Sequence, residues 1–174
     1  MLEGEGVSEV NDCAGEAARD AFDCRLCGHC CEGRGGIVVS DTDLPRLCAF
    51  LSLTPLEFEE RFGVRHCGKL FIRSNAQGCV FFSKESGCTV HAGKPDICRA
   101  WPYFRGNLVD GESLALAKDF CPGIPPQQSH AEFVREGLAY LLRENLAGSA
   151  RRDEAAALQV ADLMGRLASG DGKR

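Results

Sequence analysis

The sequence predicts a small single domain of the α+β class, in which short strands and loops form an irregular core flanked by about four helices. Three observations lead to this prediction. Short apolar runs broken by Gly, Asn and Ser fill residues 68–104. Helix-start signals stand on both sides of this segment. The chain has 174 residues, 44% hydrophobic and 26% charged, which is the composition of one globular domain.

The two ends are expected to lie outside the folded core. Residues 1–21 form a polar, acidic arm that we predict to be mobile, and residues 169–174 form a tail. The start, MLEGEGVSEVNDC, has no basic residues and no apolar run, so no secretory signal is predicted. We therefore expect a cytoplasmic protein, in a compartment that keeps thiols reduced.

The first part of the core begins at residue 22 with FDCRLCGHCC and a glycine-rich turn, EGRGG. GIVVS (36–40) predicts a short strand. A helical segment follows over residues 41–53, where Asp41 and Asp43 suit the positive end of the helix dipole. Thr54, Pro55 and Glu57 then form a capping box with proline at the first helical position, so a helix is predicted to run to residue 62.

The second part of the core consists of the runs KLFIR, CVFFS and CTV, which predict short strands joined by turns. Ser129 and Glu132 form another capping box, which opens a predicted helix over residues 129–148 that Gly148 ends. A last amphipathic helix is predicted over residues 153–168. We expect residues 22–124 to be one cysteine-rich domain, with residues 125–168 packed on it as a helical hairpin.

Eleven cysteines in a reducing compartment require an explanation other than disulfides. Their number is odd, so complete pairing would leave one sulfur over. Cys48 lies in an apolar helical run and is expected in the core, Cys13 lies in the polar arm, and Cys67 is expected to be a loop or core thiol. The other eight fall into two groups with the spacing of metal ligands.

These eight candidate ligands are Cys24, Cys27, Cys30, Cys31, Cys79, Cys88, Cys98 and Cys121. A gap of two residues lets one turn direct two thiolates at the same metal, in zinc sites and in iron–sulfur sites alike. Three thiols spaced C-x2-C-x2-C are typical of the ferredoxin-type presentation of ligands to one cluster. Because adjacent side chains on an extended backbone face opposite ways, Cys30 and Cys31 are predicted to serve different centres if the backbone is extended there. One centre and two centres both stay open.

The net charge and its distribution limit the classes of partner that we expect. The net charge of −5 argues against nucleic acid, and no apolar run is long enough for a membrane helix. Residues 65–105 nevertheless carry seven Lys and Arg and only two acids. This basic surplus either offsets the negative charge of thiolate-bound metal or forms a solvated face, and the sequence favours neither reading.

From Phe22 to Ile124 the sequence resembles the YkgJ-like cysteine-cluster proteins, the CxxCxxCC family of zinc- or iron-chelating domains. The resemblance rests on FDCRLCGHCC, GIVVSDTDL, the C-x8-C pair, KPDICRAWPYF and CPGI, in the family's order. It implies metal or cluster binding by the eight cysteines. Lys94 stands where the family usually has arginine, so a bidentate role there is not expected, while a charge role is. His91 is a further candidate ligand, three residues after Cys88 in a C-x2-H spacing.

Two functions of different classes follow. The first is an iron–sulfur protein, with a [4Fe–4S] cluster and a redox or accessory role toward a protein partner; all-cysteine ligation in a ferredoxin-like spacing favours it. The alternative is a Zn²⁺-stabilised interaction module with two four-thiolate sites. A weaker alternative is a metal-dependent enzyme, because flagellin lysine-N-methylases carry a similar cysteine pattern. The sequence identifies no catalytic residue and leaves open whether the protein is an enzyme.

Overall fold

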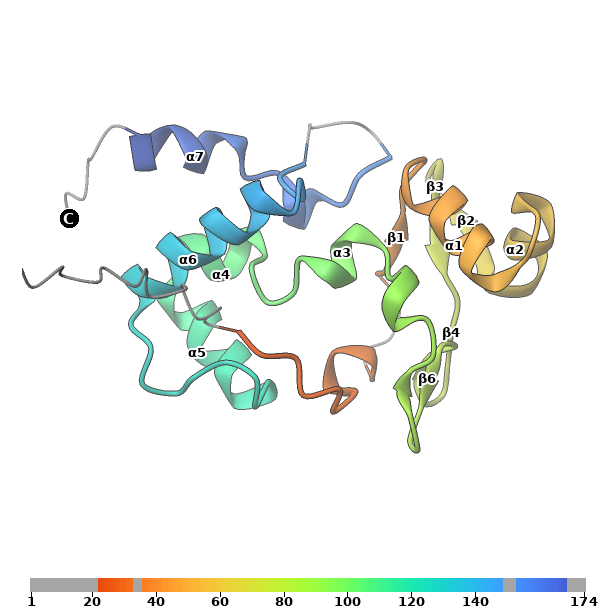
Figure 1. Cartoon of the computed structure of the whole chain (residues 1–174), viewed down its shortest axis with the longest axis horizontal. Helices are drawn as coiled ribbons and strands as arrows, with labels where there is room; N and C mark the ends of the chain where they lie inside the picture. The colour runs from red at the N-terminus through yellow and green to blue at the C-terminus, as the bar shows by residue number, and fades with distance from the viewer. Residues whose placement is uncertain (1–21, 33–35, 149–152, 169–174) are drawn as a thin grey trace, which may run out of the picture.

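The fold was analysed in a computed structural model, which describes residues 22–32, 36–148 and 153–168. The predicted arm and tail, together with Cys13, lie outside these ranges. The described residues contain seven α-helices and three small antiparallel sheets, so the predicted α+β class is confirmed (Figure 1). The sheets with α1 and α2 occupy one end of the molecule, α4 to α7 occupy the other, and α3 lies between them.

The first region is built on a three-stranded sheet and two helices, and we call it the sheet region. Its strands are β1 (Val38–Val39), β2 (Gly63–His66) and β3 (Lys69–Ile72), in the order β1-β3-β2. Helices α1 (Asp43–Leu51) and α2 (Pro55–Phe62) pack near the sheet. Alternating side chains point inward, and the core members with the lowest exposure include Val39, Leu47, Phe58, Leu70, Ile72 and Phe81.

Two short hairpins extend from the sheet region toward the N-terminal cysteines. One pairs β4 (Ser74–Asn75) with β5 (Gly78–Cys79), and the other pairs β6 (Phe82–Ser83) with β7 (Gly87–Cys88). The predicted short strands between residues 68 and 104 are therefore confirmed. Strand β2 was not predicted, because only Gly63 in it is buried and its other side chains carry no alternation.

The second region is helical, and we call it the helical region. It contains α3 (Asp96–Arg99), α4 (Arg105–Val109), α5 (Gly111–Phe120), α6 (His130–Arg143) and α7 (Ala161–Ala168). A single hydrophobic core joins these helices, and its most buried members are Tyr103, Leu114, Phe133, Leu138, Leu141 and Val160. The division into residues 22–124 and a packed hairpin over 125–168 stays a prediction, although α6 and α7 share this core with α3 to α5.

Both predicted capping boxes are present. The Thr54 hydroxyl accepts from the amide of Glu57, whose carboxylate accepts from the Thr54 amide, and Ser129 and Glu132 repeat this arrangement. Helix α6 ends at Arg143, earlier than predicted, because Asn145 takes a left-handed conformation and the Gly148 amide donates to Leu158 instead of continuing the helix.

The last helix is also shorter than predicted, since a 3-10 turn, Ala156–Leu158, precedes α7. Helices α3, α4 and α5 were not predicted at all. The longest described helix, α6, has 14 residues, and none of the helices in the described ranges combines the length and apolarity that a bilayer crossing requires.

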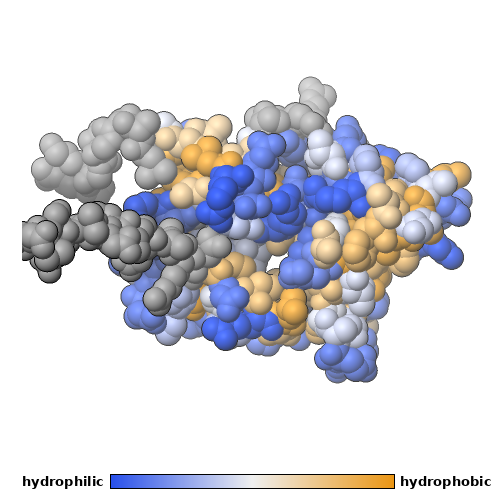
Figure 2. Space-filling model, in the orientation of Figure 1, coloured by the Kyte–Doolittle hydropathy of each residue, from blue (hydrophilic) through white to orange (hydrophobic). Residues whose placement is uncertain are grey.

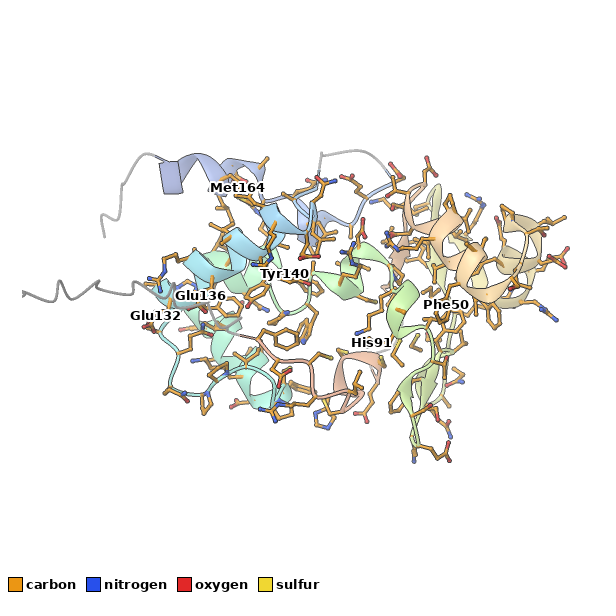
Figure 3. The ribbon with its side chains drawn as sticks, in the orientation of Figure 1. Phe50, His91, Glu132, Glu136, Tyr140 and Met164 are labelled. Atoms are coloured by element: carbon orange, nitrogen blue, oxygen red, sulfur yellow. The ribbon has the colours of Figure 1, made fainter. Side chains whose placement is uncertain are left out.

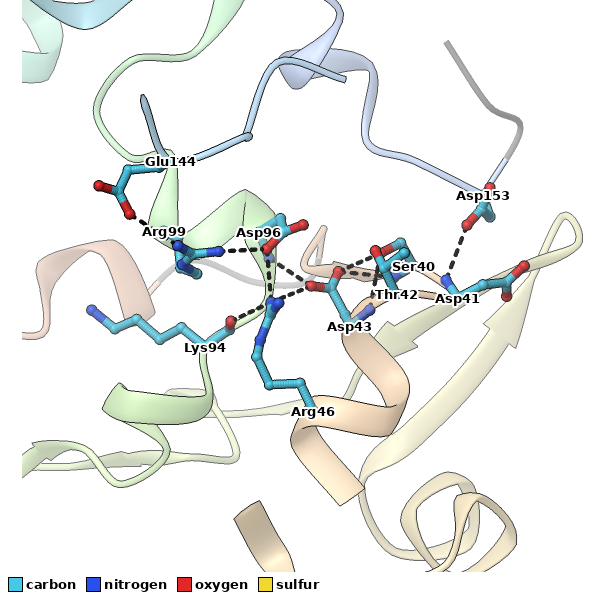
Figure 4. A network of polar contacts seen from close by, with 10 residues as sticks. All are labelled: Ser40, Asp41, Thr42, Asp43, Arg46, Lys94, Asp96, Arg99, Glu144 and Asp153. Carbon is cyan, nitrogen blue, oxygen red and sulfur yellow. Dashed lines mark hydrogen bonds and ion pairs between the residues drawn. The ribbon is translucent and has the colours of Figure 1, made fainter. Parts of the chain in front are cut away.

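A network of polar contacts joins the two regions between the start of α1 and α3, and we call it the polar junction (Figure 4). The Asp43 carboxylate, at the start of α1, is almost fully buried. Its Oδ2 accepts from the amide and hydroxyl of Ser40 at 3.0 and 2.8 Å, and its Oδ1 accepts from the amide of Asp96 at 2.8 Å and from Arg46. Asp43 therefore fixes the start of α3 against α1.

Arg46 and Arg99 extend the junction. The Arg46 guanidinium donates to the carbonyl of Lys94 at 2.8 Å and to Asp96 Oδ1 at 2.7 Å. Arg99, one turn along α3, donates to Asp96 and to Glu144 after α6, both at 3.2 Å. The segment from Lys94 to Arg99 is thus held from both sides.

Candidate metal centre

The eight predicted ligands come together around three adjoining cavities. The central cavity, of about 210 Å³, is lined by Cys30, Cys31, Cys79, Cys88 and Cys98. A smaller cavity of about 30 Å³ beside it is lined by Cys24, Cys27, Cys30, Cys31, Cys88 and Cys121. An outer cavity of about 240 Å³ is lined by Cys24, Cys30 and Cys98. Sulfurs from both ends of the cysteine-rich segment therefore surround one space between the sheet region and the helical region.

The two other described cysteines line none of these cavities. Cys48 is buried in the core of the sheet region, as predicted. Cys67 is exposed in the turn between β2 and β3. The structure thus separates the candidate ligands from the remaining thiols, while their ligation of metal stays a prediction.

Two glycines allow the hairpins to approach the N-terminal cysteines closely. Gly78 and Gly87 directly precede Cys79 and Cys88, and both have positive φ, 113° and 71°. A Cβ at Gly78 would lie 2.2 Å from the carbonyl oxygen of Cys31, and one at Gly87 would lie 2.8 Å from that of Leu26. Only glycine permits this combination of conformation and contact, so each Gly-Cys pair delivers its sulfur to the space beside the Cys24–Cys31 loop.

The helical region holds the other side of this loop. The Asp23 amide donates to the carbonyl of Gly123 at 3.2 Å, and His29 Nδ1 lies 2.8 Å from the carbonyl of Phe120. These contacts flank Cys121, whose sulfur accepts a hydrogen bond from Trp101 Nε1 at 3.5 Å. Cys121 is therefore oriented toward the first cysteine group by contacts on both sides of it in the sequence.

Cys30 and Cys31 do not face opposite ways, because the backbone there is not extended. His29–Cys31 forms a 3-10 turn, and the two Sγ atoms lie 4.0 Å apart. Both thiols line the central cavity. The prediction that the pair serves two separate centres depended on an extended backbone, and the turn removes that argument.

The thiols around the central cavity influence one another strongly. Hydrogen bonding to Cys31 is the main cause that lowers the pKa of Cys30 to about 7 and that of Cys88 to about 6. The pKa of Cys31 is raised by the same hydrogen bonds. Among these three neighbouring thiols Cys30 and Cys88 are thus the more readily ionised, and the Lys94 ammonium also favours their ionised forms. Thiolates of this kind are the form that binds metal.

The deeper sulfurs show the opposite shift. Burial raises the pKa of Cys98 well above its usual range, and neighbouring thiols, Cys79 first, raise it further. Burial also raises the pKa of Cys79. Ionisation of these two sulfurs therefore requires a cation beside them, which a bound metal provides.

The sulfurs line the walls of the space rather than meeting at one point. All ten described cysteines are free, and no three Cys, His, Asp or Glu side chains in the described ranges are already arranged around a single ion. The central cavity is far larger than the roughly 10–15 Å³ that one water-sized sphere needs. The residues present therefore fit a thiolate-bound group of several atoms, or a single ion after the sulfurs close on it.

The basic residues of 65–105 fall into two sets, one near the sulfurs and one paired with acids elsewhere. Lys94 and Arg99 line the cavities, which favours charge compensation there. Arg65 instead pairs with Glu59 and Arg105 with Asp162, both away from the sulfurs. His91 is exposed and lines the outer cavity, not the central one.

The position of Trp101, three residues after Cys98, predicts an apolar cover that excludes water from the site, and the structure places Trp101 in the cavity lining. It lines all three cavities and donates to the Cys121 sulfur. A signal was available for the glycines: Gly-Cys occurs in both GCV and GCT, and a glycine beside a ligand cysteine indicates close backbone approach. The sequence indicates the apolar role of Trp101 but not its hydrogen bond to Cys121, since the partner of an indole N–H depends on the tertiary fold.

Comparison with known proteins tests the family resemblance described above. Neither curated proteins nor solved structures gave a match to the chain. The family model described as "CxxCxxCC: Putative zinc- or iron-chelating domain" matches residues 23–122, which is more than half of the chain and contains all eight candidate ligands. The resemblance seen in the sequence is thereby confirmed, and the chain belongs to the CxxCxxCC family of cysteine-cluster, zinc- or iron-chelating domains.

Proposed function

We propose that this protein binds an iron–sulfur cluster, of the [4Fe–4S] type, through cysteine thiolates and serves a protein partner in a redox or accessory role in the cytoplasm. The proposed ligands are drawn from Cys24, Cys27, Cys30, Cys31, Cys79, Cys88, Cys98 and Cys121. The observation that carries the proposal is the central cavity, where five thiols from the N-terminal turn, the two hairpins and α3 surround about 210 Å³ of space. Cavity size favours a cluster over one ion, because sulfurs close to about 2.3 Å around Zn²⁺ and leave no such space.

When bound, a cluster supplies one-electron redox chemistry. The chain's own residues set its surroundings. Trp101 and Phe104 line the central cavity with apolar surface, which limits water near the sulfurs. The hydrogen bond from Trp101 to Cys121 and the charge of Lys94 both stabilise negative charge on sulfur. Exposed Cys24 and Cys27 mark the edge of the site nearest to solvent, which is where a redox partner would approach.

One observation favours the alternative, a zinc-stabilised interaction module. Four sulfurs arranged tetrahedrally at about 2.3 Å from Zn²⁺ lie about 3.8 Å from one another. The Cys30 and Cys31 sulfurs are 4.0 Å apart, and Cys88 is near enough to contribute to the raised pKa of Cys31. If these three sulfurs moved together around one ion, a fourth cysteine would complete a zinc site.

Anaerobic purification of the full chain distinguishes the two. A brown protein with broad visible absorption and matching iron and sulfide content supports the cluster. A colourless protein that releases zinc when its thiols are modified supports the zinc module. Protein that retains neither metal after reconstitution rejects the proposed function.

A pair of exposed cysteines provides the matched test of the ligand set. Cys27→Ser is expected to lower the metal content, because Cys27 lines the cavity beside the centre. Cys67→Ser is expected to leave it unchanged, because Cys67 is also exposed but lies in the β2–β3 turn. Equal metal content in the two variants would contradict the assignment.

A further inference from the structure

The outer cavity has a composition that metal ligation alone does not explain. Its volume is about 240 Å³, and three kinds of side chain line it in equal number. The sulfurs are Cys24, Cys30 and Cys98, the bases are His91, Lys94 and Arg99, and the aromatic residues are Phe22, Trp101 and Tyr140. Among the described residues, no carboxylate lines it. It is therefore a space lined by basic and aromatic side chains that opens beside the candidate centre.

The cavity opens at the surface of the molecule. Figure 2 shows a hollow near the middle of this face, and Figure 3 shows His91 and Tyr140 on opposite sides of the opening. His91 comes from the sheet side and Tyr140 from α6. The two regions of the molecule therefore form the two walls of the cavity, and a small molecule can enter between them.

Lys94 is the cation available to a ligand. Arg99 already pairs with Asp96 and Glu144. Within the described part of the chain, the Lys94 ammonium forms no hydrogen bond or ion pair, and Figure 4 shows its side chain extending away from the polar junction. Its backbone is fixed, because Arg46 binds the Lys94 carbonyl and the next residue, Pro95, is fully buried. A half-buried, unpaired ammonium on a fixed backbone is a prepared site for an anionic oxygen.

Lys94, Cys30 and Trp101 line all three cavities and thus stand at their junction. The charge of Lys94 therefore acts on the sulfurs as well as on the outer cavity. Compensation of thiolate charge explains the lysine. It explains neither the open space nor the three aromatic side chains on the side away from the hairpins. A flat apolar group packed on those rings would account for both.

We infer that the outer cavity binds a small organic anion, with its carboxylate at Lys94 and His91 and its flat apolar body against Phe22, Trp101 and Tyr140. The ligand would lie directly beside the metal centre, in contact with Cys24, Cys30 and Cys98. This inference rests on the proposed function, since it makes the cavity the place where a substrate or effector meets the bound metal.

Benzoate and benzamide are the probes, because they share size and shape and differ in charge. Binding to the metal-loaded full chain is measured by isothermal titration calorimetry, with the emission of Trp101, the only tryptophan, as a local readout. We expect benzoate to bind at least ~10-fold more tightly than benzamide, which corresponds to about 1.4 kcal/mol. Acetate and inorganic phosphate, which lack the flat body, are expected to bind more weakly than benzoate.

Three variants locate the anion. Lys94→Gln is expected to weaken benzoate binding ~10-fold and Lys94→Arg to preserve it, since the charge is kept. Lys84→Gln is the matched control, because Lys84 is an exposed lysine in the β6–β7 turn that lines none of the three cavities. His91→Ala, which removes an exposed side chain, is expected to weaken benzoate binding severalfold even if Lys94→Gln loses metal.

Metal content, measured on every sample, keeps the two proposals apart. Wild-type protein without metal would reject the proposed function. Metal-loaded wild type that binds benzoate and benzamide equally would reject the anion site alone. The same conclusion would follow if neither Lys94→Gln nor His91→Ala changed the benzoate affinity from that of wild type. Phosphate binding as tight as benzoate would likewise overturn the inference, because the aromatic wall would then contribute nothing.

Discussion

The sheet region and the helical region meet in two places that are built very differently. At the polar junction the protein supplies every contact: Asp43, Arg46 and Asp96 join α1 to α3 directly, with hydrogen bonds of 2.7–2.8 Å between Arg46, Asp43 and the Asp96 segment. Around the central cavity the two regions face each other across open space lined by thiols. Cys31, Cys79 and Cys88 belong to the sheet region's core or pack against it, whereas Cys98 and Cys121 belong to the helical region.

The difference shows that the contact across the central cavity, unlike the polar junction, depends on a group that is not part of the polypeptide. Ion pairs formed by charged side chains need only the folded polypeptide. Thiols with pKa values shifted in opposite directions and separated by a cavity need a cation to draw them together. Metal at the sulfurs would therefore act as a second link between the regions, in addition to binding a partner or ligand.

Metal removal should produce the largest effect, and it should be confined to one junction. With free metal about 1,000-fold above Kd, its removal costs about 4 kcal/mol of stability, or ~8–16 °C in Tm for a chain of this size. Hydrogen exchange should show lost protection in residues 22–32 and in the two hairpins. Protection at Asp43 and Asp96 should persist. Equal loss at both junctions would show that metal stabilises the whole fold rather than one link.

Breaking the polar junction should have the next largest effect. In Asp43→Asn one carboxylate oxygen becomes an NH₂ group, yet each oxygen faces donors: Ser40 on one side, Arg46 and the Asp96 amide on the other. Whichever way the asparagine is turned, its NH₂ group faces buried N–H or O–H donors and those donors lose their acceptor. We therefore expect chemical denaturation to show a loss of about 2–3 kcal/mol in the free energy of unfolding. Asp41→Asn, exposed and two residues away, should change stability by less than ~0.5 kcal/mol.

Metal content should respond less than stability does to Asp43→Asn. The substitution loosens the segment from Lys94 to Arg99, which carries Cys98, but it leaves the two hairpins in place. If the variant loses metal in full, the two junctions are not independent and the comparison drawn above fails.

Gly78→Ala tests the close approach of a hairpin to the first cysteines. The positive φ of Gly78 alone costs an alanine about 1 kcal/mol, and the clash with the Cys31 carbonyl adds to it, so we expect about 2 kcal/mol and reduced metal content. Gly68→Ala is the control, because Gly68 also has positive φ, 75°, but a Cβ there meets nothing within 4 Å. It should lose about 1 kcal/mol and keep its metal. Full metal content in Gly78→Ala would mean that the hairpin contact does not position Cys79.

The sequence predicted the features that short-range chemistry determines. The capping boxes at Thr54 and Ser129 are local patterns of three residues, and both are present. The grouping of cysteines by spacing likewise separated eight candidate ligands from Cys48 and Cys67, which the structure places elsewhere. Spacing was informative because two-residue gaps constrain where neighbouring sulfurs can point.

Features that depend on contacts distant in sequence were missed. Helices α3 and α4 have four and five residues, too short for an amphipathic pattern, and Asp43 fixes the start of α3 from 53 positions away. The direction of Cys31 relative to Cys30 depended on whether the backbone was extended or turned, and the 3-10 turn there is set by Gly28 in a left-handed conformation. The polar junction and the outer cavity both assemble from segments that no local pattern connects.

The smallest expected effect concerns acid and compares one helix cap in each region. Hydrogen bonds from Ser129 lower the pKa of Glu132 at the start of α6, and hydrogen bonds from Thr54 lower that of Glu57 at the start of α2. A carboxylate with a lowered pKa stabilises the fold above its unfolded value of 4.5, and this contribution is lost as pH falls through the folded value. Glu132→Gln and Glu57→Gln should therefore each lower stability at neutral pH and make it less dependent on pH below 4.5, as followed by urea denaturation across that range. Because both carboxylates are at the surface, raising the salt concentration should weaken both effects alike, whereas a response confined to Glu132→Gln would show that the helical region alone limits unfolding in acid.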